Sequence, residues 1–217
     1  MNIVRKLATA AVLLFLPVAV GAPAFAADRD TLLRELKGDD WEVRLMKKDA
    51  DALTDRQSVE SLIRLIRNAG LDWRLQIRGI RVLGELHTAA AEEALIQMFS
   101  DVFFHQGCPA VKTSLARALG NFRDPRVVSA LLEKLDDSEL PVRAASIVSL
   151  GRVGDAAAVP YLIERLNDPS FMIRSSAIVA LGQLGDTRAL PALEKTADSD
   201  SEPLLRMEAR AALTRVR

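Results

Sequence analysis

The chain has 217 residues and a formal net charge of zero, because 29 Lys and Arg are balanced by 29 Asp and Glu. That length is enough for a sizeable hydrophobic core. The balance excludes the concentrated basic face that a nucleic-acid-binding protein needs, so we expect no nucleic-acid partner. A single cysteine, Cys108, excludes a disulfide framework within the chain.

The N-terminus has the pattern of a secretory signal peptide. Arg5 and Lys6 precede an apolar run over residues 7–20, and residues 24–26 are Ala-Phe-Ala, the A-x-A pattern of a cleavage site. The run is shorter than the ~20 residues of a membrane span, and a single uncleaved span is the alternative. We expect cleavage after Ala26, a periplasmic or secreted protein, and no membrane contact after cleavage.

The remaining residues, 27–217, form one domain that repeats itself. VRAASIVSLGRVGDAAAVPYLIERL (142–166) is followed by IRSSAIVALGQLGDTRALPALEKTA (173–197), with corresponding positions 31 apart. Earlier copies lie 31 and then 36 residues back, and the faintest copy ends in SVESLIRLIR (58–67). A fixed period of this length indicates a repeat architecture. We place the units at about 40–67, 71–99, 109–135, 138–166 and 169–197.

Each unit has the apolar spacing of two helices. Gly151 and Gly154 are expected to end the first helix of their unit and to allow the turn. Asp155 is then expected to cap the amides of the second helix. Its counterparts in the other units also have capping side chains: Asp55, Thr88, Asp124 and Asp186.

Acidic and basic residues recur six positions apart where one unit meets the next. We expect these pairs to form a ladder of charge-assisted hydrogen bonds between units, and their recurrence favours structure over catalysis. The pairs are Asp137–Arg143, Asp168–Arg174 and Asp200–Arg206. Large apolar residues near the start of the first helices are expected to pack between units as a column: Trp41, Trp73, Leu140 and Phe171.

The D-x-x-x-x-[VI]-R start, the LGxLGD turn and the AxPxL second helix resemble HEAT repeats, in the short form of phycobilin lyase subunits. The resemblance covers roughly residues 39–217. It implies an all-α fold, an α-α superhelix or α-solenoid of about five helix pairs, with the second helices on the concave side. Such pairs need neighbours to bury their apolar faces. Residues 28–37 and the helix at 201–216 would cap the two ends.

Three catalytic hypotheses compete with a purely structural one. Iron-dependent deoxyhypusine hydroxylase, which has similar repeats, holds metal with His-Glu pairs, and this chain has none. A chromophore lyase conflicts with the signal peptide. Cys108 with His105 offers a nucleophile pair, or a metal site with Asp101. His87 occupies the place of Gly154, which indicates a turn. We predict no catalytic residue, metal or cofactor.

A protein or peptide partner remains, bound on the concave face. The predicted contact residues are polar positions of the second helices together with two phenylalanines of the five-residue insertion: Arg64, Gln97, Glu133, Lys134, Tyr161, Glu164, Arg165, Lys195, Phe103 and Phe104. For the two phenylalanines we consider two alternatives, contact with a partner or packing back over the repeat junction, and we predict the second. Two alternatives stay open: an accessory subunit of a periplasmic enzyme or redox system with a reactive or metal-bound Cys108, and a self-associating module.

Overall fold

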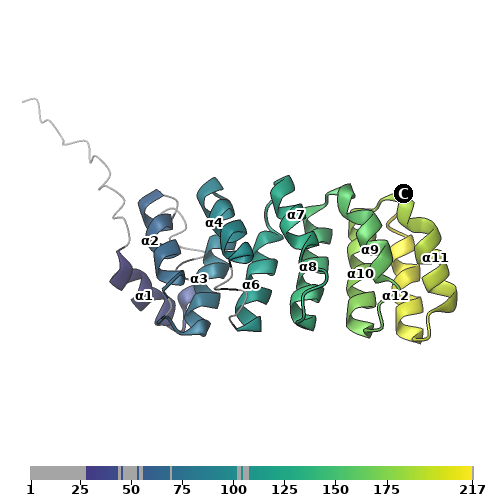
Figure 1. Cartoon of the computed structure of the whole chain (residues 1–217), viewed down its shortest axis with the longest axis horizontal. Coiled ribbons are helices and arrows are strands. Elements are labelled where there is room, and N and C mark those ends of the chain that lie inside the picture. The colour runs from purple at the N-terminus through teal and green to yellow at the C-terminus, as the bar shows by residue number, and fades with distance from the viewer. Residues whose placement is uncertain are drawn as a thin grey trace, which may run out of the picture.

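The fold is a row of stacked helix pairs (Figure 1). This computed structural model describes residues 28–43, 45, 53, 56–68, 70–101, 104 and 108–216. Within these ranges it contains α-helices and two short 3₁₀ helices and no strand, so the expected all-α solenoid is confirmed. None of the described helices is long and apolar enough to cross a membrane. The expected signal peptide and the cap Asp55 lie outside the described residues.

Helices alternate along the row between two roles. The first helices are α3 (Trp73–Glu85), α6 (Pro109–Leu119), α8 (Leu140–Val153), α10 (Phe171–Leu184) and α12 (Pro203–Leu213). The second helices are α2 (Arg56–Ile66), α4 (Ala89–Ser100), α7 (Pro125–Leu132), α9 (Val159–Arg165) and α11 (Leu190–Ser199). Helix α1 (Arg29–Lys37) packs on α2 and α3 at one end of the row, and the 3₁₀ helices η3 (Ala156–Ala158) and η4 (Thr187–Ala189) lead into α9 and α11.

The turn within each unit follows the sequence prediction. The carboxylate of Asp155 accepts a hydrogen bond from the backbone N–H of Ala157 at 2.8 Å, and Thr88, Asp124 and Asp186 cap in the same way. Gly154 ends α8 in the left-handed conformation, with φ of 81°. These side chains satisfy amides that the start of a helix leaves without partners.

His87 occupies the left-handed position that Gly154 fills in a later unit, with φ of 49°. This conformation costs a residue with a Cβ about 1–2 kcal/mol. The His87 ring lies 5.9 Å from the ring of Phe122, measured between centroids. The histidine is therefore a turn residue that retains an aromatic contact.

Close contacts between successive first helices depend on glycine. A Cβ added to Gly84 would lie 2.9 Å from the Cβ of Ala118, and one added to Gly151 would lie 2.8 Å from the Cα of Ala180. The same pairing recurs at Gly120 with Ser149 and at Gly182 with Ala212. Gly151 lies inside α8 and does not end it, so its expected role was wrong. It permits close packing.

The predicted Asp–Arg pairs form, with different bonding partners. Within a pair the arginine donates to the backbone carbonyl of the aspartate, as Arg174 does to Asp168 at 2.9 Å. The Asp168 carboxylate instead accepts from the Ser170 amide at 2.7 Å. The bond between units joins Arg174 to the aspartate of the next pair: Arg174 Nε donates to Asp200 Oδ2 at 2.9 Å, and both side chains are largely buried.

The expected packing column forms only in part. Trp41 is 6% exposed, whereas Trp73 and Phe171 are 40% and 42% exposed, so they do not pack between units as expected. Trp73 lies at the first position of α3, where its ring stacks against the guanidinium of Arg74 at 4.4 Å. A first-turn position leaves one side of a large ring in water even when the helix below it is buried.

Exchanging the partners of one glycine contact tests the packing between first helices. Gly84→Ala should lower the free energy of unfolding by about 1–3 kcal/mol, because the new methyl group overlaps Ala118. Helix propensity alone predicts a gain of about 1 kcal/mol. The double variant Gly84→Ala/Ala118→Gly should recover part of the loss. Urea unfolding measures all three; a stabilised single variant would contradict the packing role.

Two substitutions at position 87 test the turn. His87→Gly and His87→Ala both remove the ring that contacts Phe122, and only alanine keeps the steric cost of positive φ. The glycine variant should therefore be more stable than the alanine variant by about 1 kcal/mol. Thermal and urea unfolding measure the difference. Equal stabilities would show that the backbone at this position carries no such cost.

Candidate partner-binding surface

Most of the predicted contact residues on the second helices reach solvent. Six of them are exposed: Arg64, Gln97, Glu133, Tyr161, Glu164 and Lys195. Lys134 and Arg165 are partly buried. Phe104 is 3% exposed and belongs to the hydrophobic core, so it folds back over the junction and offers a partner no surface in this structure. Phe103 lies outside the described residues.

Charged side chains on the second-helix side bond to one another. Arg165 Nη1 donates to the Asp136 carboxylate at 2.8 Å. Arg126, at the start of α7, bonds to both Glu93 and Asp124, and these hydrogen bonds lower the pKa values of the two carboxyl groups. These arginines of the second-helix side are therefore paired with carboxylates of the chain.

Partial burial also marks Lys134. Burial lowers the pKa of the Lys134 ammonium group, and the nearby carboxylates of Asp137 and Glu133 partly offset this shift by raising it. The ammonium lies 5.7 Å from the centroid of the Phe99 ring, within the range of a cation–π contact. Lys134 is thus held against the preceding unit.

Exposed large apolar side chains gather on the first helices. Of the eight found among the described residues, six lie on first helices: Trp73, Phe171, Met172, Val179, Leu204 and Met207. Tyr161 is the one that lies on a second helix, and Val43 precedes α2. Contiguous exposed apolar surface is typical of interaction sites. Trp73 and Phe171 were expected to pack between units, and the other four were not predicted as contact residues, because that prediction drew on the second helices and the insertion.

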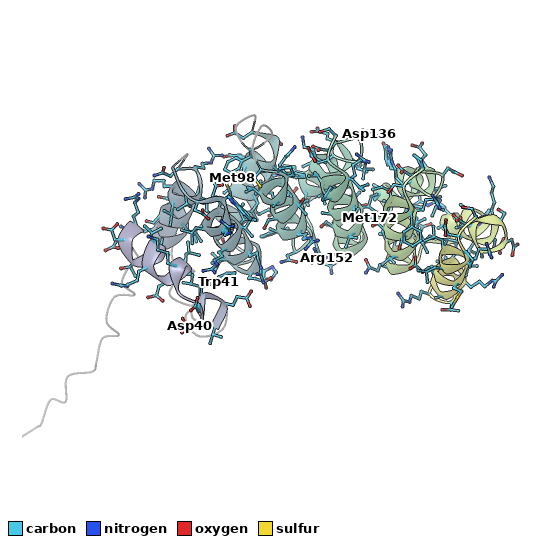
Figure 2. All side chains as sticks on the ribbon, turned by 90° about the horizontal axis from the view of Figure 1, so that it is seen from below. Asp40, Trp41, Met98, Asp136, Arg152 and Met172 are labelled. Carbon is cyan, nitrogen blue, oxygen red and sulfur yellow. The ribbon has the colours of Figure 1, made fainter. Side chains whose placement is uncertain are left out.

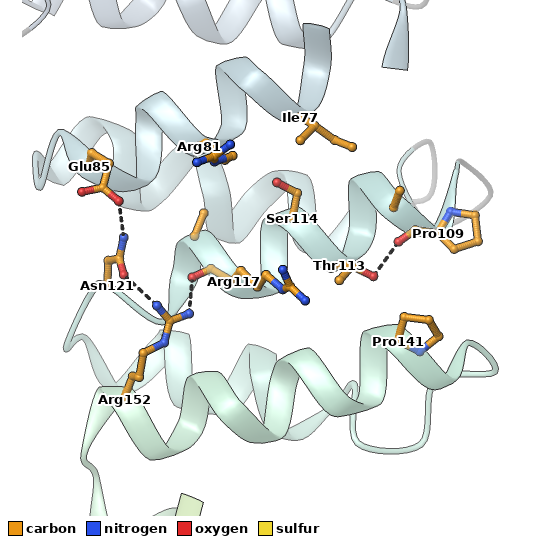
Figure 3. Close-up of a pocket in the computed structure, with 12 residues that line it drawn as sticks. Ile77, Arg81, Glu85, Pro109, Thr113, Ser114, Arg117, Asn121, Pro141 and Arg152 are labelled. Carbon is orange, nitrogen blue, oxygen red and sulfur yellow. Dashed lines mark hydrogen bonds between the residues drawn. The ribbon is translucent and has the colours of Figure 1, made fainter. Parts of the chain in front are cut away.

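A groove of about 760 Å³ runs across the first helices α3, α6 and α8 (Figure 3). Its residues include Arg81 and Glu85 from α3, Thr113 and Arg117 from α6, and Arg152 from α8. Figure 2 shows Arg152 and Asp136 on opposite long sides of the molecule. The side that carries Arg152 is formed by the solvent-facing residues of α3, α6, α8, α10 and α12, and we call it the first-helix face.

Hydrogen bonds order one end of the groove. Arg152 donates to Asn121 Oδ1 at 3.3 Å and to the backbone carbonyl of Arg117 at 2.9 Å. Asn121 in turn donates to the carboxylate of Glu85 at 3.3 Å. These bonds connect three successive units (Figure 3), so the polar end of the groove has a fixed shape.

A second depression, of about 590 Å³, lies between α9 and α11 and contains Lys195. The buried pair of Arg174 and Asp200 contributes to its wall. Both charges of that pair are satisfied within the chain.

The hypothesis of a reactive cysteine has limited structural support. Cys108 is a partly buried free thiol immediately before α6, and no side-chain cap bond forms there. His105 lies outside the described residues. In the described part of the chain, no group of three or more His, Cys, Asp or Glu side chains is arranged to hold a metal ion.

Comparisons of sequence and structure point to one class of protein. The family model for HEAT repeats matches residues 59–150, 101–170 and 128–214. A designed armadillo repeat protein in complex with the peptide (KR)4 is 18% identical, with a TM-score of 0.58 over 86% of this chain and 98% of that one. The complex of CpcE and CpcF of phycocyanin lyase from Nostoc sp. PCC7120 is 20% identical, with a TM-score of 0.52 over 92% and 79%.

No curated protein matches the sequence. The similarity to the solved structures establishes the fold. The family model for HEAT repeats covers the larger part of the chain. The repeated turns, the glycine contacts and the family match agree, and this chain belongs to the HEAT-repeat family.

Proposed function

We propose that this protein is an exported, non-catalytic scaffold that binds a protein or peptide segment on its first-helix face. The observation that carries the proposal is that the groove and most of the exposed large apolar side chains both belong to the first helices. Grooves lined by both apolar and charged groups suit protein segments, because apolar contact supplies affinity and polar groups supply specificity.

The assignment of the face differs from the one that the repeat resemblance implied. Some charged residues of the second-helix side already have partners within the chain, as Arg165 has in Asp136. Releasing such a pair to bind a ligand costs the energy of the existing bond. On the first-helix face, Arg117 has no ion-pair partner among the described residues and apolar side chains such as Met172 are exposed, so this face is the better candidate.

A role without catalysis fits the groups on this face. The groove holds arginines and one carboxylate and lacks a histidine, cysteine or second carboxylate among its described lining residues. General acid–base or nucleophilic chemistry at neutral pH usually needs such groups. The designed armadillo protein that shares the fold is itself complexed with a peptide, which supports a binding role by analogy.

Two substitutions of matched exposure test the choice of face. Met172 on α10 is 49% exposed and Tyr161 on α9 is 47% exposed. In affinity capture from the native periplasm, the parent protein should retain a reproducible partner. Met172→Glu should reduce the captured amount at least about tenfold, since a charge is placed in an apolar contact. Tyr161→Glu should retain it.

Circular dichroism and urea unfolding of both variants provide the control, because each changed side chain is exposed and the fold should persist. Loss of capture in Tyr161→Glu alone would move the binding surface to the second helices. Capture of no partner by the parent protein would contradict the scaffold function itself.

Export is tested separately. Full-length tagged protein, expressed in a Gram-negative host, should appear in the periplasmic fraction with Ala27 as its N-terminal residue. N-terminal sequencing and mass spectrometry of that fraction measure this directly. Protein that keeps Met1 and stays in the membrane fraction would instead support an uncleaved anchor.

A further inference from the structure

The groove across α3, α6 and α8 carries an excess of positive charge. Its lining residues include three arginines, Arg81, Arg117 and Arg152, and a single carboxylate, Glu85. Arg81 is paired with Glu42 at 2.6 Å. The other two arginines have no carboxylate at ion-pair distance among the described residues.

These two guanidinium groups differ in what they bind. Arg152 donates to neutral acceptors, the amide oxygen of Asn121 and the carbonyl of Arg117. The guanidinium of Arg117 makes no hydrogen bond or ion pair within the described chain, and its side chain lies between α6 and α8 (Figure 3). Partial burial lowers the pKa of Arg152, and the positive charge of Arg117 lowers it further. A carboxylate bound here would offset this repulsion.

The same face becomes apolar toward the C-terminal end of the row. In the register set by the glycine contacts, Arg117 of α6 corresponds to Val148 of α8 and to Val179 of α10. The neighbouring solvent positions of α10 and α12 carry large apolar side chains: Met172, Leu204 and Met207. One continuous series of repeat positions therefore changes from basic to apolar along the row.

The spacing of the units sets the length of a ligand that contacts both regions. Neighbouring packed helices lie about 8–10 Å apart. Among the first helices, α10 lies two steps beyond α6 and α12 lies three, so roughly 20 to 30 Å separates the free guanidinium region from the apolar contacts. An extended chain rises about 3.3 Å per residue and covers that distance in about six to nine residues.

We propose that the first-helix face binds an extended segment of a partner protein with carboxylates at one end and large apolar side chains about six to nine residues away. The carboxylates bind at Arg117 and Arg152, and the apolar side chains lie on Met172, Val179, Leu204 and Met207. This proposal rests on the proposed scaffold function and names the chemistry of its partner. Its polarity is opposite to that of a basic peptide ligand.

Selection from a phage-displayed library of random 12-residue peptides tests the proposal on the purified protein. Enriched peptides should contain Asp or Glu and, about six to nine residues away, Leu, Ile, Met, Phe or Trp. One enriched peptide is then synthesised, and its Kd is measured by fluorescence anisotropy. Its affinity should fall as salt rises from 50 to 500 mM, because exposed ion pairs are screened.

Three substitutions localise the binding. Arg117→Glu and Met207→Glu should each raise the Kd of the synthetic peptide at least about tenfold. The first removes a charged contact of the peptide and the second removes an apolar one. Lys195→Glu makes a charge change of the same size on α11, away from the first-helix face, and should change Kd by less than about twofold. All three side chains are exposed, and circular dichroism checks that each variant folds.

Enrichment of basic peptides, enrichment of none, or peptides that bind Arg117→Glu as tightly as the parent would each overturn this proposal. The scaffold function has its own test in the capture of a native partner. If capture succeeds and peptide selection fails, the scaffold function stands and the acidic, extended ligand is wrong. If both fail, the scaffold function fails with it.

Discussion

The close approach of successive first helices is the constraint on which the rest of this structure depends. Each contact joins a glycine of one unit to a small residue of the next, as Gly151 joins Ala180. A methyl group at the glycine would overlap backbone or Cβ atoms of the neighbour, so the interval between units is fixed by two small side chains. Repetition of one interval makes the helices a regular row.

The regular row determines which surfaces are left for function. An inner first helix such as α8 is covered by the first helices on both sides and by the second helix of the preceding unit, which leaves one face toward solvent. Equivalent positions of every unit then align on that face, where Arg117, Val148 and Val179 occupy one series. A partner that lies along the row contacts several units at once. On the other side, ion pairs such as that of Arg165 with Asp136 link charges to one another.

Local features were predictable from the sequence, because their chemistry is contained in a few neighbouring residues. The caps Asp155 and Thr88 and the left-handed Gly154 are of this kind. The role of Gly151 was not predictable, because it depends on a helix 29 residues further along the chain. Exposure of Trp73 was also missed: its position in the first turn of α3 matters more than its hydrophobicity. The groove needs three units placed together.

Site-specific photo-crosslinking tests the assignment of the binding face most directly. A photoreactive amino acid replaces either Ala110, an exposed groove residue of α6, or Glu164, an exposed residue of α9. Both proteins are irradiated in the native cell. The account predicts a discrete crosslinked partner from position 110 and none from position 164. A partner crosslinked from position 164 alone would contradict it and assign binding to the second helices.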